Sequence, residues 1–393
     1  MTISIFITKS FKNTIERDGR TMKKCILMVI MIVMVGSVPA CKKNQPVELL
    51  WKYVGQSPSY STPLILDDLL IFGNEDGYLT ALNKKTGEPR WSYNVGMNII
   101  SAPKYAQGKI LFGSINYNFY AVDSTGKEAW KFTTRRAIKS DPTTKGDIVY
   151  FTSYDGHIYA LKIANKELVW KFPESHNEKV AALKAEGKEL GGLVEDLKVG
   201  EFSYSSPAID GDIMYVGNLD NHLYAVNIQD GTMVFRFKTE DAVTSSPVVE
   251  NGIVYFGSND KHLYAIDAKE GKKVIFKVAT QEWVNSSPRI DGDRIYFGSN
   301  DKNMYAIDKK SGNIIGKFTA AGPVISIPAI YKNLVIFAGG QGDGTVYFVD
   351  KETFKPVFEY KTGGKIESDP VLDGNIVYIT STDRFTYSFK INF

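Results

Sequence analysis

The amino-acid sequence predicts an all-β protein, an eight-bladed β-propeller made of four-stranded antiparallel blades. Eight prolines open copies of one repeat, at spacings of 40, 39, 65, 40, 41, 40 and 42 residues: Pro63, Pro103, Pro142, Pro207, Pro247, Pro288, Pro328 and Pro370. Two of these copies, residues 246–267 and 287–308, are nearly duplicates. A strand-rich repeat of about 40 residues is typical of propeller blades. The 34 glycines and 12% aromatic residues also suit many short strands joined by tight turns.

The fifth copy, residues 244–278, shows how one blade is expected to form. Three turn signals, Asn251-Gly252, Asn259-Asp260-Lys261 and Glu270-Gly271-Lys272, separate four runs of apolar and β-branched residues. This pattern predicts a four-stranded antiparallel meander. Because proline has no backbone N–H to donate, Pro247 belongs on an edge strand. The strand that opens each copy is therefore expected to line the central channel.

The fourth strand of most copies places a polar or charged residue between two large apolar ones, as in Trp91-Ser92-Tyr93 and Trp130-Lys131-Phe132. Alternation puts both rings on one face of the strand. Buried between neighbouring blades, each ring would contribute about 1.5 to 3 kcal/mol. The tryptophans are therefore interpreted as core residues and not as a cofactor-binding group.

The eighth copy ends at Phe393 without an outer strand of its own, whereas Leu49 to Tyr53 precede the first copy and read as an orphan outer strand. Pairing this segment with residues 384–391 would close the ring. Closure by the N-terminal strand is expected because an open array would leave two long unprotected edges.

The first 41 residues are expected to be an export signal. Basic Met22-Lys23-Lys24 is followed by the apolar run Ile26 to Val35 and then by Val38-Pro39-Ala40-Cys41. The apolar run is short for a membrane span, and small residues precede the cysteine. We therefore expect translation to begin at Met22, cleavage before Cys41 and lipidation of Cys41. A plain secretory signal or an uncleaved anchor is the alternative.

This interpretation divides the chain into a signal at 1–41, a tether at 42–46 and a propeller at 47–393. Removal of residues 1–41 leaves 41 basic and 42 acidic residues, a net charge of −1. Such a balance lacks the basic excess of nucleic-acid-binding proteins, so no nucleic-acid partner is expected. The propeller holds no cysteine, because Cys25 and Cys41 both belong to the signal and its cleavage point.

The spacing of 65 residues between Pro142 and Pro207 indicates an insertion at residues 173–202. Apolar residues recur there at mostly helical spacing, which predicts one or two short helices broken near Gly187 or Gly191-Gly192. Two roles stay open for this insertion: a helical cap packed on the rim of the propeller, or a docking element for a partner.

The segment from Ala81 to Trp91 resembles AxDxxTGxxxW, the tryptophan-docking motif of the pyrroloquinoline-quinone (PQQ) propeller superfamily, and residues 121–130 and 160–170 match it more loosely. The resemblance covers nearly all of residues 47–393. Eight blades and a lipidated N-terminus make the chain most similar to the BamB family of outer-membrane assembly lipoproteins. That resemblance implies a periplasm-facing scaffold at the outer membrane that binds the barrel-inserting protein or other envelope proteins.

The varied loops between blades are expected to open on one face and to carry the partner site. Mixed charges with scattered aromatic rings suit a protein partner better than a small anion. We expect a monomer that binds through Arg135, Arg136, Lys139, Lys198, Val199, Glu201, Phe202, Glu240, Asp241, Glu282, Trp283 and Lys365. Trp283 is expected either to plug the mouth of the channel or to anchor a ligand.

No catalytic residues, metal site or cofactor are predicted. His157, His222 and His262 recur at equivalent positions of three consecutive blades, but a whole sheet would separate them, which is incompatible with shared zinc ligation. The alternative is a PQQ-dependent oxidoreductase or a ligand-sensing propeller. The resemblance implies that quinoprotein dehydrogenases hold PQQ beneath vicinal cysteines with calcium and an aspartate, and the propeller has no such cysteine pair.

Overall fold

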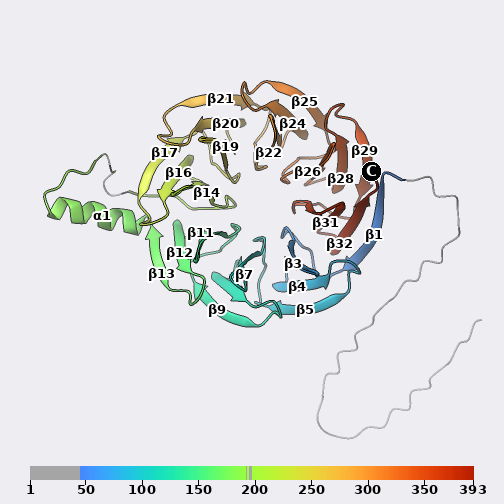
Figure 1. Ribbon diagram of the computed structural model, residues 1–393, viewed down its shortest axis with the longest axis horizontal. Helices are drawn as coiled ribbons and strands as arrows, with labels where there is room; N and C mark the ends of the chain where they lie inside the picture. Colours follow the sequence, from blue (N-terminus) through green and yellow to red (C-terminus); the bar gives the residue numbers. More distant parts are fainter. Residues whose placement is uncertain (1–44, 192, 194–196) are drawn as a thin grey trace, which may run out of the picture. The chain divides into compact units, whose positions relative to one another are not determined.

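A computed structural model describes residues 45–191, 193 and 197–393 of the chain. The strands form eight separate four-stranded antiparallel sheets arranged as a ring (Figure 1). The predicted fold class, an eight-bladed β-propeller, is therefore confirmed. The expected export signal, the start at Met22 and the lipidated Cys41 lie outside the described residues.

Each blade runs from an innermost to an outermost strand. Blades 1 to 4 are β2(Leu64–Leu66), β3(Leu69–Gly73), β4(Tyr78–Asn83), β5(Pro89–Asn94); β6(Lys104–Ala106), β7(Lys109–Gly113), β8(Asn118–Val122), β9(Glu128–Thr133); β10(Thr143–Lys145), β11(Ile148–Ser153), β12(His157–Lys162), β13(Leu168–Phe172); and β14(Ala208–Asp210), β15(Ile213–Gly217), β16(His222–Asn227), β17(Met233–Lys238).

Blades 5 to 8 repeat this order. They are β18(Val248–Glu250), β19(Ile253–Gly257), β20(His262–Asp267), β21(Val274–Ala279); β22(Arg289–Asp291), β23(Arg294–Gly298), β24(Asn303–Asp308), β25(Ile314–Thr319); β26(Ala329–Tyr331), β27(Leu334–Ala338), β28(Thr345–Asp350), β29(Pro356–Lys361); and β30(Val371–Asp373), β31(Ile376–Thr380), β32(Phe385–Ile391) with β1(Val47–Val54) outermost.

The N-terminal strand closes the ring, as expected. β1 pairs antiparallel with β32, from Val47 opposite Ile391 to Val54 opposite Phe385. In Figure 1 the blue β1 lies beside the red β32, which brings the two ends of the described chain together. The eighth blade thus takes three strands from the C-terminus and one from the N-terminus.

The hydrophobic core lies between adjacent blades. One cluster joins Tyr255, Leu263 and Ala265 of blade 5 to Ile295 and Phe297 of blade 6, and equivalent clusters follow around the ring. The two middle strands of each blade are almost entirely buried, because each contacts a neighbouring blade on either face. Every blade therefore depends on both of its neighbours for burial.

Most outer-strand rings dock on a turn of the next blade, usually against a glycine. Trp91 Nε1 donates to Ser124 O at 2.9 Å, and its ring covers Gly126, where an added Cβ would lie 2.5 Å from Trp91 Cε3. Gly126 has a φ of 83°, a conformation that side chains rarely adopt. Trp130 and Trp170 are buried and donate in the same way to Ile163 O and Ile228 O. The tryptophans pack between blades, as the alternating pattern indicated.

The insertion contains one helix, α1(Glu174–Ala185), which lies outside the ring beside β13 and β17 (Figure 1). It ends just before Gly187, whose φ of 67° suits glycine after a helix. His176 and Val180 are its buried residues, and the Met233 N–H donates to His176 Nδ1 at 3.2 Å. Within the described part of the insertion, residues beyond Ala185 adopt no second helix.

Candidate functional site: the loop face and the channel mouth

One face of the propeller gathers the loops between blades and the second hairpin of each blade; we call it the loop face. Backbone hydrogen bonds tie the two sets together, as in Asn259 N to Ala242 O at 2.8 Å and Thr382 N to Lys365 O at 3.0 Å. The first and third hairpins of each blade lie at the opposite end of the strands, which we call the turn face. The expected grouping of the varied loops follows from this topology.

A repeated aspartate fixes the loop face. Asp260 Oδ2 accepts hydrogen bonds from Tyr264 OH at 2.7 Å and from the Glu240 amide at 3.1 Å, so one carboxylate joins a blade to the preceding interblade loop. The same arrangement recurs at Asp155, Asp220, Asp301, Asp343 and Asp383. The loops are therefore held by repeated hydrogen bonds to these carboxylates although their tips are exposed.

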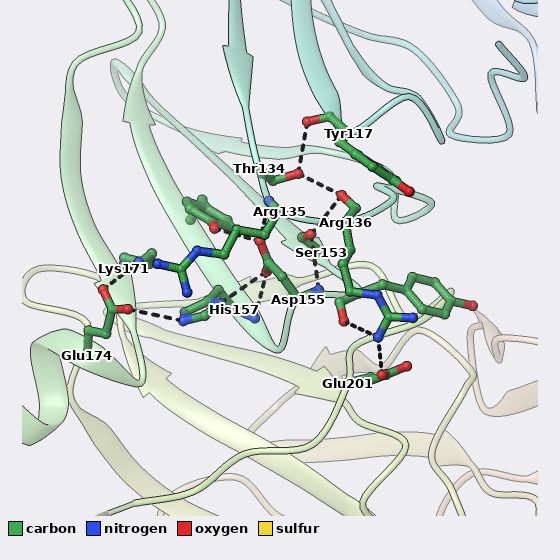
Figure 2. A network of polar contacts seen from close by, with 12 residues as sticks. Tyr117, Thr134, Arg135, Arg136, Ser153, Asp155, His157, Lys171, Glu174 and Glu201 are labelled. Carbon is green, nitrogen blue, oxygen red and sulfur yellow. Dashed lines mark hydrogen bonds and ion pairs between the residues drawn. The ribbon is translucent and has the colours of Figure 1, made fainter.

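The three equivalent histidines belong to these turns. His157, His222 and His262 each place Nδ1 within 3.3 Å of an aspartate oxygen two residues earlier in the same blade. His157 also reaches Glu174 Oε1 through Nε2 at 3.4 Å, and Lys171 Nζ lies 2.5 Å from Glu174 Oε2 (Figure 2). This chain of contacts fastens the start of α1 to blade 3.

Burial alone would raise the pKa of Asp155 at the centre of Figure 2. Hydrogen bonds from His157, the Arg135 amide and Tyr159 outweigh burial and hold that pKa below its usual range. Arg135 thus uses its backbone to fix the loop and leaves its side chain exposed. Arg136 pairs with Glu201 across the junction between blades 3 and 4.

Lys139 sits between two aromatic rings at the mouth of the channel. Its Nζ lies 3.2 Å from both Tyr154 OH and Tyr204 OH, and 4.7 Å from the centre of each ring. Burial lowers the pKa of Lys139, but the interactions with Tyr204 and Tyr154 more than offset that effect, so the pKa is raised. Lys139 therefore stays charged and held in place.

The segment from Lys198 to Phe202 is only partly a surface. Lys198 and Glu201 are exposed, and Val199 is half-buried against the cluster between blades 3 and 4. Phe202 is fully buried and packs edge-on against Tyr224, with ring centres 6.2 Å apart. Phe202 therefore anchors the loop and offers no surface to a partner.

The remaining predicted residues line the other side of the loop face. Glu240 and Asp241 are exposed, and Glu282 pairs with Lys261 at 3.4 Å. Lys365 Nζ contacts Glu367 Oε1 at 2.6 Å and lies 5.3 Å from the centre of the Tyr60 ring. Trp283 is 45% exposed and lines the central cavity, so its ring stands at the mouth of the channel; its role as a plug or a ligand anchor stays a prediction.

The cavity behind this mouth has a volume of about 490 Å³ and receives residues from all eight blades. Its floor is a belt formed by the residues that precede the repeat prolines. Where this residue is Asp, Ser or Thr, its side chain accepts a hydrogen bond from the equivalent amide of the preceding blade. Six links are formed: Ala102 to Asp141, Asp141 to Ser206, Ser206 to Ser246, Ser246 to Ser287, Ile327 to Asp369 and Asp369 to Thr62.

Two acidic residues of this belt, Asp141 and Asp369, were not identified from the sequence. Burial at the floor of the central cavity, together with the mutual repulsion of the two carboxylates, raises the pKa of Asp141 to about 7. Burial also raises the pKa of Asp369 to about 6. The signal that could have found them is their shared register, since both directly precede a repeat proline.

Comparisons with known proteins agree with the resemblance to the docking motif. The sequence profile of the family described as outer membrane protein assembly factor BamB matches residues 41–104, 96–194 and 176–274, more than half of the chain. Outer membrane protein assembly factor BamB of Yersinia pestis is 24% identical over 220 residues, covering 48% of this chain and 56% of that protein. The Shewanella oneidensis protein of the same name is 21% identical over 229 residues, covering 50% and 57%. The chain spans slightly more than half the length of these curated relatives.

Solved structures share the fold. BamB from Moraxella catarrhalis superposes with a TM-score of 0.69 at 16% identity, over 88% of this chain and 99% of that one. The computationally designed protein Ika8 gives 0.71 at 16% identity, over 87% and 99%. A europium-containing methanol dehydrogenase gives 0.70 at 13% identity, over 88% and 93%. At such identities these likenesses show the architecture alone.

Proposed function

The chain belongs to the BamB family of outer membrane protein assembly factors, and from this premise we propose that it is a non-catalytic scaffold in the assembly of β-barrel proteins of the outer membrane. It binds the barrel-inserting protein, or other envelope proteins, through its loop face. It acts as a monomer anchored by a lipid on Cys41, faces the periplasm and has no nucleic-acid partner.

The construction of the loop face carries this proposal. Exposed charged side chains such as Arg135, Glu240 and Lys198 share the loop face with the half-exposed rings of Trp283 and Tyr204. Aromatic residues inside a polar rim are the usual composition of a protein interface. The aspartate turns hold the loops before a partner arrives, which lowers the entropy lost on binding.

The position of Val47 limits which face of the propeller a lipid on Cys41 could hold near the membrane. Val47 pairs with Ile391 at the turn face, whereas Val54 lies at the loop face. Six steps of chain separate Cys41 from Val47 and reach at most about 21 Å. β1 alone rises about 24 Å between its ends. A lipid on Cys41 therefore keeps the turn face or the rim of blade 8 near the membrane and leaves the loop face free. Among the described residues, no helix is long and apolar enough to cross a bilayer.

The residues of the central cavity do not fit PQQ, the quinone that the superfamily's dehydrogenases use. PQQ is a polyanion, whereas three acids, Asp141, Glu367 and Asp369, and one base, Lys139, line the cavity. No group of three histidine, cysteine, aspartate or glutamate side chains suited to a metal ion occurs within the described ranges. Titration with PQQ and calcium tests the oxidoreductase alternative, for which tight stoichiometric binding with dye-coupled activity would be required.

Affinity capture from solubilised envelopes tests the scaffold. The intact lipoprotein is expected to recover the barrel-inserting protein, and Arg135→Ala combined with Trp283→Ala is expected to reduce recovery at least about fivefold. Lys272→Ala combined with Val274→Ala is the matched control on the turn-face side, because Val274 is 42% exposed and the Lys272 side chain 84%. Equal recovery by both double variants would exclude the loop face as the binding surface.

Lipidation is tested separately by metabolic labelling with palmitate. Label is expected on the wild-type protein and not on Cys41→Ala. Mass spectrometry of the precursor tests the start at Met22, since a peptide from residues 3–12 would contradict it.

A further inference from the structure

The cavity at the centre of the loop face has an acidic floor with no counter-ion. Asp141 Oδ1 accepts the Ala102 amide at 2.6 Å, and a hydrogen bond from the Ser206 side chain also favours its ionised form. Asp369 accepts the Ile327 amide at 2.6 Å and Thr62 Oγ1 at 3.0 Å. Neither carboxylate forms an ion pair with any residue that the structure describes. Two enclosed carboxylates without a cation are costly to keep ionised.

The nearby bases are engaged elsewhere. Lys139 Nζ is held by the hydroxyls of Tyr154 and Tyr204, and Arg289 Nε donates to Pro328 O at 3.1 Å. Lys104 and Arg289 act on the carboxylates only at long range, and Glu367 adds a third acid, which Lys365 pairs. The cavity therefore lacks a positive charge at its floor.

The mouth is suited to the stem and head of a basic side chain. Trp283 and Tyr204 are 45% and 51% exposed, and both line the cavity with the apolar Ile100, Leu219 and Ile325. Rings at this mouth already hold cations, since Lys139 lies 4.7 Å from the centre of the Tyr204 ring and Lys365 lies 5.3 Å from that of Tyr60. Cation–π contacts of this kind are favourable at partly desolvated sites.

We propose that this cavity receives a lysine or arginine side chain from the protein that binds the loop face. The inference rests on the proposed scaffold function and adds the chemistry of the partner's central contact. The aliphatic stem passes the rings of Trp283 and Tyr204, and the charged end pairs with Asp141 and Asp369 at the floor. A single basic residue would thus fill the central, desolvated position at which interfaces concentrate their binding energy.

The pairing requires ionised carboxylates, which gives the contact a pH dependence. Burial raises the pKa of Asp141 to about 7 and that of Asp369 to about 6. A cation at the floor of the cavity favours the ionised forms of these two carboxylates. Binding of the basic side chain is therefore coupled to the release of protons from them. Affinity is expected to fall as the pH is lowered from 8 to 5.5.

Calorimetric titration of the purified propeller with the blocked peptide acetyl-Gly-Arg-Gly-amide tests the proposal. Acetyl-Gly-citrulline-Gly-amide is the matched probe, because citrulline keeps the shape of arginine and lacks its charge. The arginine peptide is expected to bind with a dissociation constant in the millimolar range, and the citrulline peptide at least about tenfold more weakly.

Asp141→Asn and Asp369→Asn each retain a side-chain oxygen for the hydrogen bonds of the belt. Each substitution is expected to raise the dissociation constant of the arginine peptide about tenfold. Glu75→Gln removes an exposed loop-face acid outside the cavity and is expected to change affinity less than about twofold. Equal binding of the two peptides, or equal effects of Asp141→Asn and Glu75→Gln, would overturn the proposal. Because this titration needs no partner, its failure is distinct from failure of the envelope capture.

Discussion

Gly316 and Phe354 exchange the positions that an aromatic ring and a glycine occupy at most other blade junctions. Gly316 pairs with Ala306 in β25, where β5 has Trp91 opposite Ala81. Phe354 occupies the turn position that Gly87 and Gly126 hold in blades 1 and 2. A Cβ added at Gly316 would lie 2.0 Å from Phe354 Cε2. The ring of blade 7 therefore fills the space that an outer-strand ring fills elsewhere.

This exchange predicts a compensating pair of substitutions. Phe354→Gly is expected to destabilise the propeller by about 1 kcal/mol, because loss of the half-buried ring exceeds relief of the positive φ of 55°. Gly316→Phe alone is expected to destabilise by about 1 to 3 kcal/mol through overpacking. The double variant should be more stable than the sum of the two changes by about 1 kcal/mol in a urea unfolding cycle. Strict additivity would contradict the exchange.

Removal of the closing strand is expected to destabilise the whole ring. Deletion of residues 48–54 takes away the partner of β32, together with Trp51 and Tyr53, which pack between blades 8 and 1. The melting temperature is expected to fall by more than about 10 °C in calorimetry. Deletion of residues 42–44 is the control and should leave the melt unchanged. An unaltered melt after loss of residues 48–54 would show that the ring does not depend on β1.

The buried carboxyl groups of Asp141 and Asp369 should make the free energy of unfolding fall as the pH rises. Because folding raises the pKa of Asp141 from 3.8 to about 7, its stabilising contribution is complete below pH 4 and is lost as the pH rises through 7. Asp369 acts in the same direction through about pH 6. Asp141→Asn is expected to raise the melting temperature by about 2 °C at pH 8 and to have a smaller effect at pH 5.

Asp76→Asn, at an exposed loop-face turn, is the control for this pH series and should follow the wild type. The comparison is between wild type and variant at each pH, so other titrating groups cancel. A larger gain at pH 5 than at pH 8 would contradict the assigned direction.

The contacts of Glu174 should hold the first turn of α1 against blade 3. Burial alone would raise the pKa of Glu174, but hydrogen bonding to Lys171 and the charge of His157 hold it below its usual range. The Glu174 side chain is 48% exposed, so its pairing contributes less than about 1 kcal/mol. Glu174→Ala is expected to accelerate amide hydrogen exchange in α1 severalfold without changing the global melt. Glu178→Ala, on the same helix, is the control, and equal acceleration in both variants would argue against the anchor.

Much of the architecture can be read from local signals in the sequence. The prolines mark each inner strand because a missing N–H confines them to an edge, and the orphan segment at Trp51 identifies the closing strand. The functional surface is less accessible to such reasoning. Phe202 stands in a polar loop and is nevertheless buried, because only the fold brings it against Tyr224.

The hub belt was missed for a related reason. Each of its links joins residues of different blades, as between Asp141 and Ser206, so no pattern within one repeat reveals it. The exchange between Gly316 and Phe354 is likewise visible only when the two residues are considered together. Within its own repeat, each is simply an unusual residue: a glycine at an aromatic position and a phenylalanine at a glycine position.

The position of β1 has a mechanical consequence. The chain enters the propeller at Val47, the first residue of the strand that completes the ring, and seven opposed residue pairs join β1 to β32. Tension along the axis of β1 would load these residue pairs together in shear. A pull at right angles to the strand would instead break them one after another. With the proposed lipid on Cys41, a pull on the anchor along β1 would therefore be carried by all seven residue pairs between β1 and β32.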